Sequence, residues 1–170
     1  MVSRPTDTAA FERFWQPHRP RVWRLAARLA GNADLADDLT QEISLRAFQG
    51  FATFRGGSSA YTWLYRIAVH VVLRHRERLV LETVPYGDAP EVADPASDPQ
   101  AGLLQSEVRP VVWAALNRLP EDQRTAVILS IYEELKYREI AEVLQIPLGT
   151  VKSRLHAGMI HLREELKDAL

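Results

Sequence analysis

The chain has 170 residues, of which 46% are hydrophobic and 25% charged, and this ordinary globular composition excludes wholesale disorder. The sequence contains no Cys, so disulfides, thiolate metal sites and cysteine nucleophiles are excluded. The N-terminus lacks the apolar core of a signal peptide, and no apolar run is long enough to span a membrane. We therefore expect a protein that is neither exported by that route nor inserted directly in a membrane.

The net charge of −1 conceals an uneven distribution. Residues 1–78 carry 12 Lys and Arg against 7 Asp and Glu, whereas residues 79–108 carry six acids and no base. Residues 109–170 carry nine charges of each sign. The basic first part is compatible with nucleic acid binding, although the whole chain is close to neutral.

Apolar residues recur at intervals of three and four in both halves of the chain, and no stretch alternates in the manner of a strand. This periodicity predicts an all-α fold with helices over residues 8–29, 33–49, 60–79, 105–117, 121–132, 137–144 and 148–166. Pro17 and Pro20 are expected to interrupt the first of these helices.

The middle of the chain separates the two halves. Residues 84–100 hold four of the ten prolines together with four acids, and proline at this density prevents helix formation. A structureless loop of this length is uncommon inside a compact domain, which favours a linker over a surface loop. We predict two helical domains, residues 1–80 and 105–170, joined by a flexible acidic linker over residues 81–104.

The last two helices have the pattern of a helix-turn-helix, since a short amphipathic helix ends at Gln145-Ile146-Pro147 and a longer one follows. The expected buried stripe of the second helix is Val151, Leu155, Met159, Leu162 and Leu166. The opposite face carries Lys152, Ser153 and His156, with Arg154 at its flank, and these groups suit phosphates and base edges. An ordinary helical hairpin is the alternative, and we expect His156 and His161 to be surface histidines rather than metal ligands.

A second basic region lies in the first half. The residues Arg66, His70, Arg74 and Arg78 recur every four positions and form a stripe on one helix face. A glycine- and serine-rich loop bounded by aromatics precedes the stripe at residues 54–63, and its Ser58, Ser59 and Thr62 can pair with an extruded base. A solvated face is the alternative for the stripe, and core packing is favoured over base contact for Trp63.

Five polar residues share one face of the second predicted helix near its N-terminus: Asp34, Asp37, Asp38, Gln41 and Glu42. Spacing alone favours stabilisation of the helix N-terminus by carboxylates on a solvated face. A metal site is a weaker interpretation because no other ligand converges on these groups. A docking face for a basic partner is the third.

Taken together, the segments at residues 34–48, 54–68 and 119–124, followed by residues 137–155, resemble the bacterial sigma factors of the extracytoplasmic-function (ECF) group of the sigma-70 family. They occur in the order that the family shows, and the two matching domains cover nearly all of the chain outside the linker and the extreme N-terminus. The sequence departs from the family pattern in three places, since His70 replaces a usual Asn, Gln145 a frequent Gly, and residues 157–161 a stretch that is often Arg-rich.

The resemblance implies a non-enzymatic specificity subunit of core RNA polymerase that recognises promoter DNA and helps to melt the −10 element, acts in the bacterial cytoplasm, and needs no cofactor or metal. The acidic face would dock on the polymerase, and the linker would thread toward the RNA exit channel. The implied −10 contacts are Phe54, Arg55, Ser58, Ser59, Tyr61, Arg66, His70, Arg74 and Arg78. The implied −35 contacts are Thr150, Lys152, Ser153, Arg154 and His156. The group is commonly inhibited by an anti-sigma factor, which is often membrane-anchored.

Two other classes of function remain open from the residues alone. A stand-alone helix-turn-helix regulator would need a ligand pocket or phospho-acceptor in the first half, and that half offers instead an acidic helix and a basic aromatic loop. A metal-dependent nuclease would have to use Asp37, Asp38 and Glu42, which lie on one helix with no converging partner.

Overall fold

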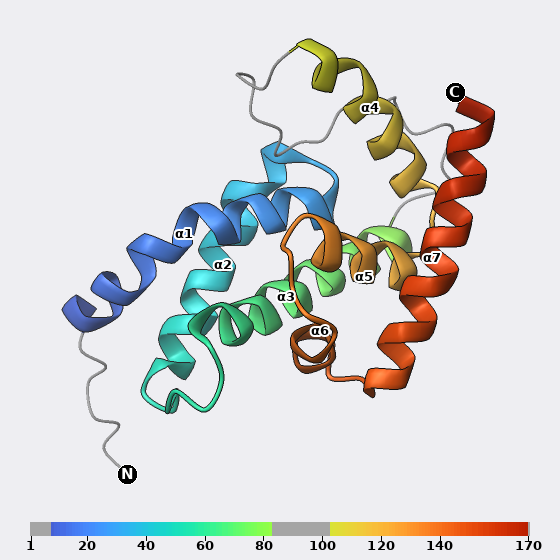
Figure 1. Cartoon of the computed structure of the whole chain (residues 1–170). Helices are drawn as coiled ribbons and strands as arrows, with labels where there is room; N and C mark the ends of the chain where they lie inside the picture. The colour runs from blue at the N-terminus through green and yellow to red at the C-terminus, as the bar shows by residue number, and fades with distance from the viewer. Residues whose placement is uncertain (1–7, 83–102, 170) are drawn as a thin grey trace. The chain divides into compact units, whose positions relative to one another are not determined.

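The computed structural model describes residues 8–82 and 103–169, which form seven α-helices and no strand, so the predicted all-α fold class is confirmed. The chain divides into two compact units, Met1–Leu79 and Val80–Leu170. Figure 1 shows the helices in chain order. They are α1 (Thr8–Ala30), α2 (Ala33–Phe51), α3 (Ala60–Glu82), α4 (Leu103–Asn117), α5 (Glu121–Ile131), α6 (Tyr137–Leu144) and α7 (Leu148–Ala169). The outermost positions of the predicted linker, 81–82 and 103–104, are therefore helical, and the rest of it lies outside the described residues.

Helix α1 is continuous through Pro17 and Pro20, so the predicted interruption is wrong. A proline inside a helix removes the hydrogen bond to the carbonyl four residues earlier, which belongs here to Arg13 and Gln16. Both prolines and both of these residues are exposed. Water can therefore hydrate the released carbonyl groups, and the helix continues on its buried side.

The turn from α1 to α2 is closed by two specific residues. Gly31 has a φ of 69°, and its N–H donates to the Ala27 carbonyl at 2.9 Å. A left-handed residue at this position ends a helix, and glycine adopts that conformation without steric cost. Asn32 then caps α2, since its Oδ1 accepts a hydrogen bond from the Asp34 N–H at 2.8 Å. The acidic face of α2 therefore begins at a fixed point.

Side-chain contacts join α1 and α3 at two points. Near their N-terminal parts the rings of His18 and Tyr61 lie 4.7 Å apart, and near the C-terminal end of α1 the Arg76 Nη1 donates to the Leu29 carbonyl at 2.8 Å. The core of the first unit holds fully buried apolar side chains from all three helices. The largest of these include Leu25, Leu29, Ile43, Leu64, Tyr65 and Val72.

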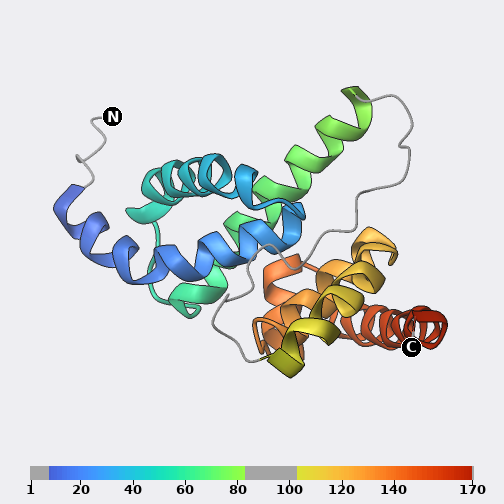
Figure 2. The same ribbon diagram turned by 90° about the horizontal axis from the view of Figure 1, so that it is seen from above.

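The second unit packs α4, α5 and α6 against the long helix α7 (Figure 2). A Cβ on Gly158 would lie 2.8 Å from Val127 Cγ2, so glycine allows α5 and α7 to approach closely. Gly158 is buried and Met159 is 46% exposed, so the predicted place of Met159 in the buried stripe is wrong. Val151, Leu155 and Leu162 are buried as expected.

A tight turn joins α6 to α7. Gln145 has a φ of 54° and lies in the left-handed region, and its N–H donates to the Ala141 carbonyl. The N–H of Ile146 donates to the same carbonyl at 3.1 Å. The Pro147 carbonyl accepts from the N–H groups of the first turn of α7. The left-handed conformation explains why glycine is favourable at position 145, since glycine carries no Cβ.

Candidate functional site

The acidic face of α2 is largely accessible to solvent. Asp34, Asp37, Asp38 and Gln41 are exposed, whereas Glu42 is half-buried. No residue that the structure describes pairs with the Asp38 carboxylate. Asp37 Oδ1 accepts a hydrogen bond from Trp23 Nε1 at 2.9 Å, and Glu42 Oε1 lies 3.0 Å from Arg46 Nη2. The four carboxylates of this face therefore differ in how far a neighbouring side chain already engages their charge.

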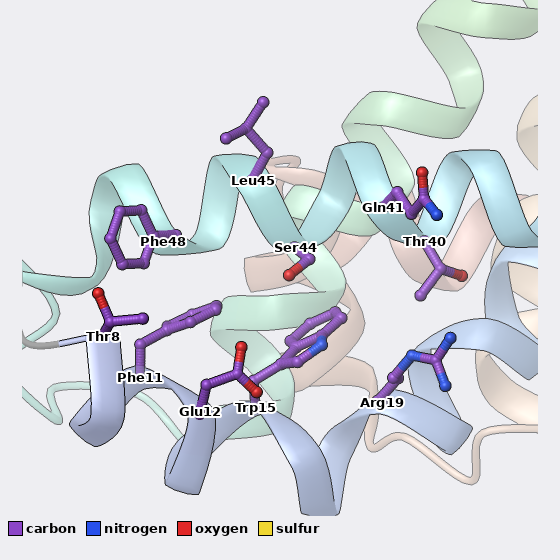
Figure 3. Close-up of a pocket in the computed structure, with 10 residues that line it drawn as sticks. All are labelled: Thr8, Phe11, Glu12, Trp15, Arg19, Thr40, Gln41, Ser44, Leu45 and Phe48. Carbon is purple, nitrogen blue, oxygen red and sulfur yellow. The ribbon is translucent and has the colours of Figure 1, made fainter.

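The same face carries an apolar group that the sequence analysis did not single out. Leu45, which is 57% exposed, follows Gln41 by four residues and Asp38 by seven, so it lies on the polar face. Figure 3 shows a groove between α1 and α2 that Leu45 borders. The groove has a volume of about 350 Å³ and is lined by Thr8, Phe11, Glu12, Trp15, Arg19, Thr40, Gln41, Ser44, Leu45 and Phe48. A leucine on the same helix face as the acids, seven residues after Asp38, was the sequence signal that could have located the groove.

The loop between α2 and α3 is held by its aromatic residues. Phe54 and Trp63 lie 4.7 Å apart between ring centroids, and both contact Phe14 of α1. Tyr61 is half-buried, whereas Arg55, Gly56 and Gly57 are exposed. Gly56 has a φ of 71°, a backbone conformation that glycine tolerates best. Trp63 is half-buried in this aromatic cluster, in line with the packing role that we favoured for it.

The hydroxyl groups of the loop are not all available. Ser59 precedes α3, and its Oγ accepts a hydrogen bond from the Thr62 N–H at 3.1 Å. Thr62 Oγ1 lies 2.7 Å from the same Oγ, and Thr62 is 2% exposed. Thr62 therefore contributes to the start of the helix, and the prediction that it faces a base is wrong. Ser58 is half-buried and Ser59 is exposed.

The residues of the basic stripe become more exposed to solvent toward the C-terminal end of α3. Arg66 is half-buried and its Nε has no described hydrogen-bond partner. His70, Arg74 and Arg78 are exposed. The four residues advance along the helix by about 6 Å per step, since an α-helix rises 1.5 Å per residue. The three guanidinium groups and the imidazole form a row of hydrogen-bond donors along α3, and the row begins near the loop.

The predicted groups of α7 lie at its N-terminal end. Lys152, Ser153 and His156 are exposed, and Thr150 is half-buried. Ser153 Oγ donates to the Thr150 carbonyl at 3.1 Å. Arg154 is half-buried, and its Nε lies 3.7 Å from Asp122 Oδ2 of α5. The structure therefore brings these residues together on one helix end, with Arg154 held to the side.

The described residues hold neither a metal-type cluster of side chains nor a helix of membrane-spanning character. No three His, Asp or Glu side chains of residues 8–82 and 103–169 are grouped as they would be around a metal ion. No helix within those ranges is long and apolar enough to cross a membrane. His161 is exposed, and its Nδ1 lies 2.7 Å from Gln123 Oε1, which is a contact between α7 and α5.

Two family models match the chain, and each coincides with one group of surfaces. The model "Sigma-70 region 2" matches residues 14–80, which include the acidic face, the loop and the basic stripe. The model "Sigma-70, region 4" matches residues 110–162, which include the helix-turn-helix. Together the two matches cover more than half of the chain.

Curated relatives match almost the full length. The RNA polymerase sigma-H factor of Pseudomonas aeruginosa is 33% identical, with 96% of this chain and 88% of the relative covered. The ECF RNA polymerase sigma factor SigE of Mycolicibacterium smegmatis is 38% identical, with 98% of this chain and 68% of the relative covered. The ECF RNA polymerase sigma factor SigW of Bacillus subtilis is 30% identical over 95% of this chain and 91% of its own length.

Solved structures agree with these matches. The sigma factor RpoE of Bartonella quintana, solved in complex with the anti-sigma factor NepR, is 27% identical with a TM-score of 0.73, and 94% of this chain and 98% of that chain are covered. CnrH, solved with the cytosolic domain of CnrY, has a TM-score of 0.66 at 20% identity and shares the fold. The chain belongs to the sigma-70 family and is an ECF RNA polymerase sigma factor, which directs core polymerase to specific promoters.

Proposed function

We propose that each described surface serves one step of promoter use. The exposed face of α2 docks on core RNA polymerase, the loop before α3 and the stripe of α3 hold the opened −10 strand, and the N-terminal end of α7 reads the −35 element. In this scheme residues 1–80 form the polymerase and −10 domain, residues 81–104 the linker, and residues 105–170 the −35 domain.

The face of α2 carries the docking assignment, because exposed carboxylates and an exposed apolar side chain lie on the same helix face. An interface needs apolar area for affinity and charges for orientation. Asp34 and Asp38 supply negative charge on the N-terminal side of Leu45, and the half-buried Phe48 lines the groove beside it. Asp37 and Glu42 contribute less, since each is held by a neighbouring side chain.

Charge reversal tests this docking surface. The double variant Asp34→Lys, Asp38→Lys should lose core polymerase in a pull-down while its circular dichroism stays that of a helical protein. The matched control Glu164→Lys, Asp168→Lys changes the net charge equally on exposed positions of α7 and should bind core polymerase normally. Equal retention of polymerase by both variants would refute the docking assignment.

The loop before α3 fits strand capture because its backbone is irregular while its ends are held. Residues 55–59 lie outside any helix, and aromatic groups flank them. An extruded base can enter such a loop and stack on an aromatic ring, which offsets the few kcal/mol that unstacking costs. The arginines of α3 then lie where the phosphates of the strand would continue.

Deletion of Gly57 and Ser58 tests strand capture. The shortened loop should still permit core binding and −35 binding, since those surfaces lie on α2 and α7. Open-complex formation should be abolished, which permanganate reactivity of thymines near the start site measures. Normal reactivity would show that another part of the chain captures the strand.

The chain also has a candidate inhibitor. Because the RpoE relative of Bartonella quintana was solved with an anti-sigma factor, we propose that an anti-sigma factor binds this chain and occludes its polymerase and DNA surfaces. Purification of the chain from its native host tests this, since the bound fraction should contain either core polymerase or the inhibitor. Recovery of polymerase alone under every growth condition would argue against an inhibitor.

A further inference from the structure

Helix α1, to which the sequence analysis assigned no role, contacts both ends of the loop before α3. Between ring centroids, Phe14 lies 5.8 Å from Phe54 at the start of the loop and 6.0 Å from Trp63 in the first turn of α3. Phe14 also contacts Phe51, the last residue of α2, at 5.1 Å. One side chain of α1 therefore holds the point at which the chain leaves α2.

At the far end of the loop, Tyr61 lies against two further residues of α1. The Arg21 guanidinium carbon is 4.2 Å from the centroid of the Tyr61 ring and 5.7 Å from that of Tyr65. The His18 ring lies 4.7 Å from the Tyr61 ring and 5.1 Å from Phe14. His18 thus connects the groups that hold the start of the loop to those that hold its end.

Two polar groups of α1 lose contact with water in this arrangement, which lowers the stability of the fold. His18 Nδ1 is buried and has no hydrogen-bond partner among the described residues, although a buried polar atom normally has one. Arg21 is only half-exposed, so its charge lies over an aromatic ring and has less contact with water. A guanidinium over a ring face is attracted by the ring quadrupole, and the attraction fixes the ring direction.

We propose that α1 positions the −10 loop, with Arg21 as the positioning residue that sets the direction of Tyr61 through the cation–π contact. The proposal rests on the strand-capture role that we assign to the loop. Within the described part of the chain, residues 55–58 make no backbone–backbone hydrogen bond, so their conformation depends on where the ends of the loop are held. Fixing both ends before DNA arrives reduces the ordering that base capture must otherwise supply.

The test measures the rate of open-complex formation by the holoenzyme on a duplex promoter. Arg21→Met keeps the aliphatic stem and removes the cation, and it should slow opening about five- to tenfold, the equivalent of a cation–π contact of average strength. Arg21→Lys retains a cation and should recover part of the rate. Arg24→Met removes an exposed arginine from the same helix and should open the promoter at the normal rate.

A double-mutant cycle separates positioning from general packing. Tyr61→Leu removes the ring, so adding Arg21→Met to Tyr61→Leu should slow opening no further. The affinity of Arg21→Met for core polymerase should equal that of the unmodified chain, and its melting temperature should fall by no more than about 4–8 °C, the shift expected for the loss of one cation–π contact in a domain of this size. Additive effects in the cycle, or a parallel loss of stability and core binding, would overturn the positioning role.

The loop deletion distinguishes the two levels of the proposal. If Arg21→Met opens the promoter at the normal rate while the Gly57–Ser58 deletion does not open it, the positioning role fails and strand capture stands. If the deletion also opens the promoter normally, strand capture itself fails.

Discussion

The two proposed DNA-binding regions differ in how their side chains are held. In the loop before α3, Phe54 and Tyr61 are part of the packing, and each rests on a ring or a cation of α1. On α7, Lys152, Ser153 and His156 project from a regular helix and are exposed. A duplex presents its base edges at fixed positions, so a rigid helix with free side chains suffices to read it. A melted strand has no fixed form, so its receptor needs an adaptable segment with fixed ends.

Glycine serves the two regions in different ways. Gly56 permits a positive φ of 71° in the loop, and a Cβ there would meet no atom within 4 Å. Gly158 is buried, and its missing Cβ leaves room for Val127. Glycine therefore provides backbone freedom in the first unit and helix proximity in the second, and substitutions should have correspondingly different consequences.

The largest effect is expected from the free side chains of α7. Lys152→Ala should cost about 1–3 kcal/mol of binding to the preferred −35 sequence if the ammonium touches base edges. The loss should disappear when the −35 element is scrambled, because the contact would then be absent in both proteins. Arg163→Ala removes an exposed arginine side chain farther along α7 and should not alter the preference for one −35 sequence over another. Transcription from a set of −35 variants measures both, and equal sensitivity to scrambling in Lys152→Ala and the unmodified chain would exclude this helix end as the reader.

Gly158→Ala should destabilise the second unit by about 1–2 kcal/mol. Overpacking a core costs about 1–3 kcal/mol, and the better helix propensity of alanine returns up to about 1 kcal/mol. Gly149→Ala is the matched control on the same helix, since a Cβ at position 149 meets nothing within 4 Å. Hydrogen exchange of the α5 and α7 amides should be faster in Gly158→Ala and unchanged or slower in Gly149→Ala. Equal protection in the two variants would contradict the close approach of these helices.

The regular elements were predictable from the sequence, because the apolar period marks helices wherever one face is buried. Packing partners were not. Gly158 rather than Met159 is buried because α5 approaches α7 at that point, and the approach depends on residues some thirty positions earlier in the chain. Helix α1 tolerates Pro17 and Pro20 because both face solvent, and the sequence does not reveal which side of the helix is covered.

The candidate sites divide in the same way. The acidic face and the two basic regions follow from spacing on a helix. The contact of Arg21 with Tyr61 joins residues 40 positions apart and has no local signature. Thr62 carries a hydroxyl group that could bind a base, but its side chain is buried at the start of α3, next to the Ser59 cap.

A smaller effect, of opposite sign, is expected at the turn between α6 and α7. Gln145 occupies a left-handed conformation that costs a residue with a Cβ roughly 1 kcal/mol. Gln145→Gly should therefore stabilise the second unit by about 0.5–1 kcal/mol, after the greater flexibility of glycine in the unfolded chain is subtracted. Gln145→Ala retains a Cβ and should bring no gain. Urea unfolding of the three proteins measures the difference, and a destabilised Gln145→Gly would contradict the strain.

The smallest effect concerns pH and returns to the support of the loop. Burial, and then the Arg21 cation, lower the pKa of His18 below its usual 6.5 in the folded protein. Above pH 6.5 the ring is neutral in both the folded and the unfolded chain, so stability does not depend on it. As the pH falls below 6.5, the unfolded chain takes up the proton first, and stability decreases until the pH has passed the folded pKa. His18→Gln removes this titration, and the two proteins share every other ionisable group, so the difference between them reports on His18 alone. As the pH is lowered through this range, the free energy of unfolding of the unmodified chain should therefore decrease relative to that of His18→Gln.

A difference that stays constant with pH would contradict this prediction. It would show that the His18 ring takes up a proton equally easily in the folded protein, and hence that it does not lie buried between Phe14 and Tyr61.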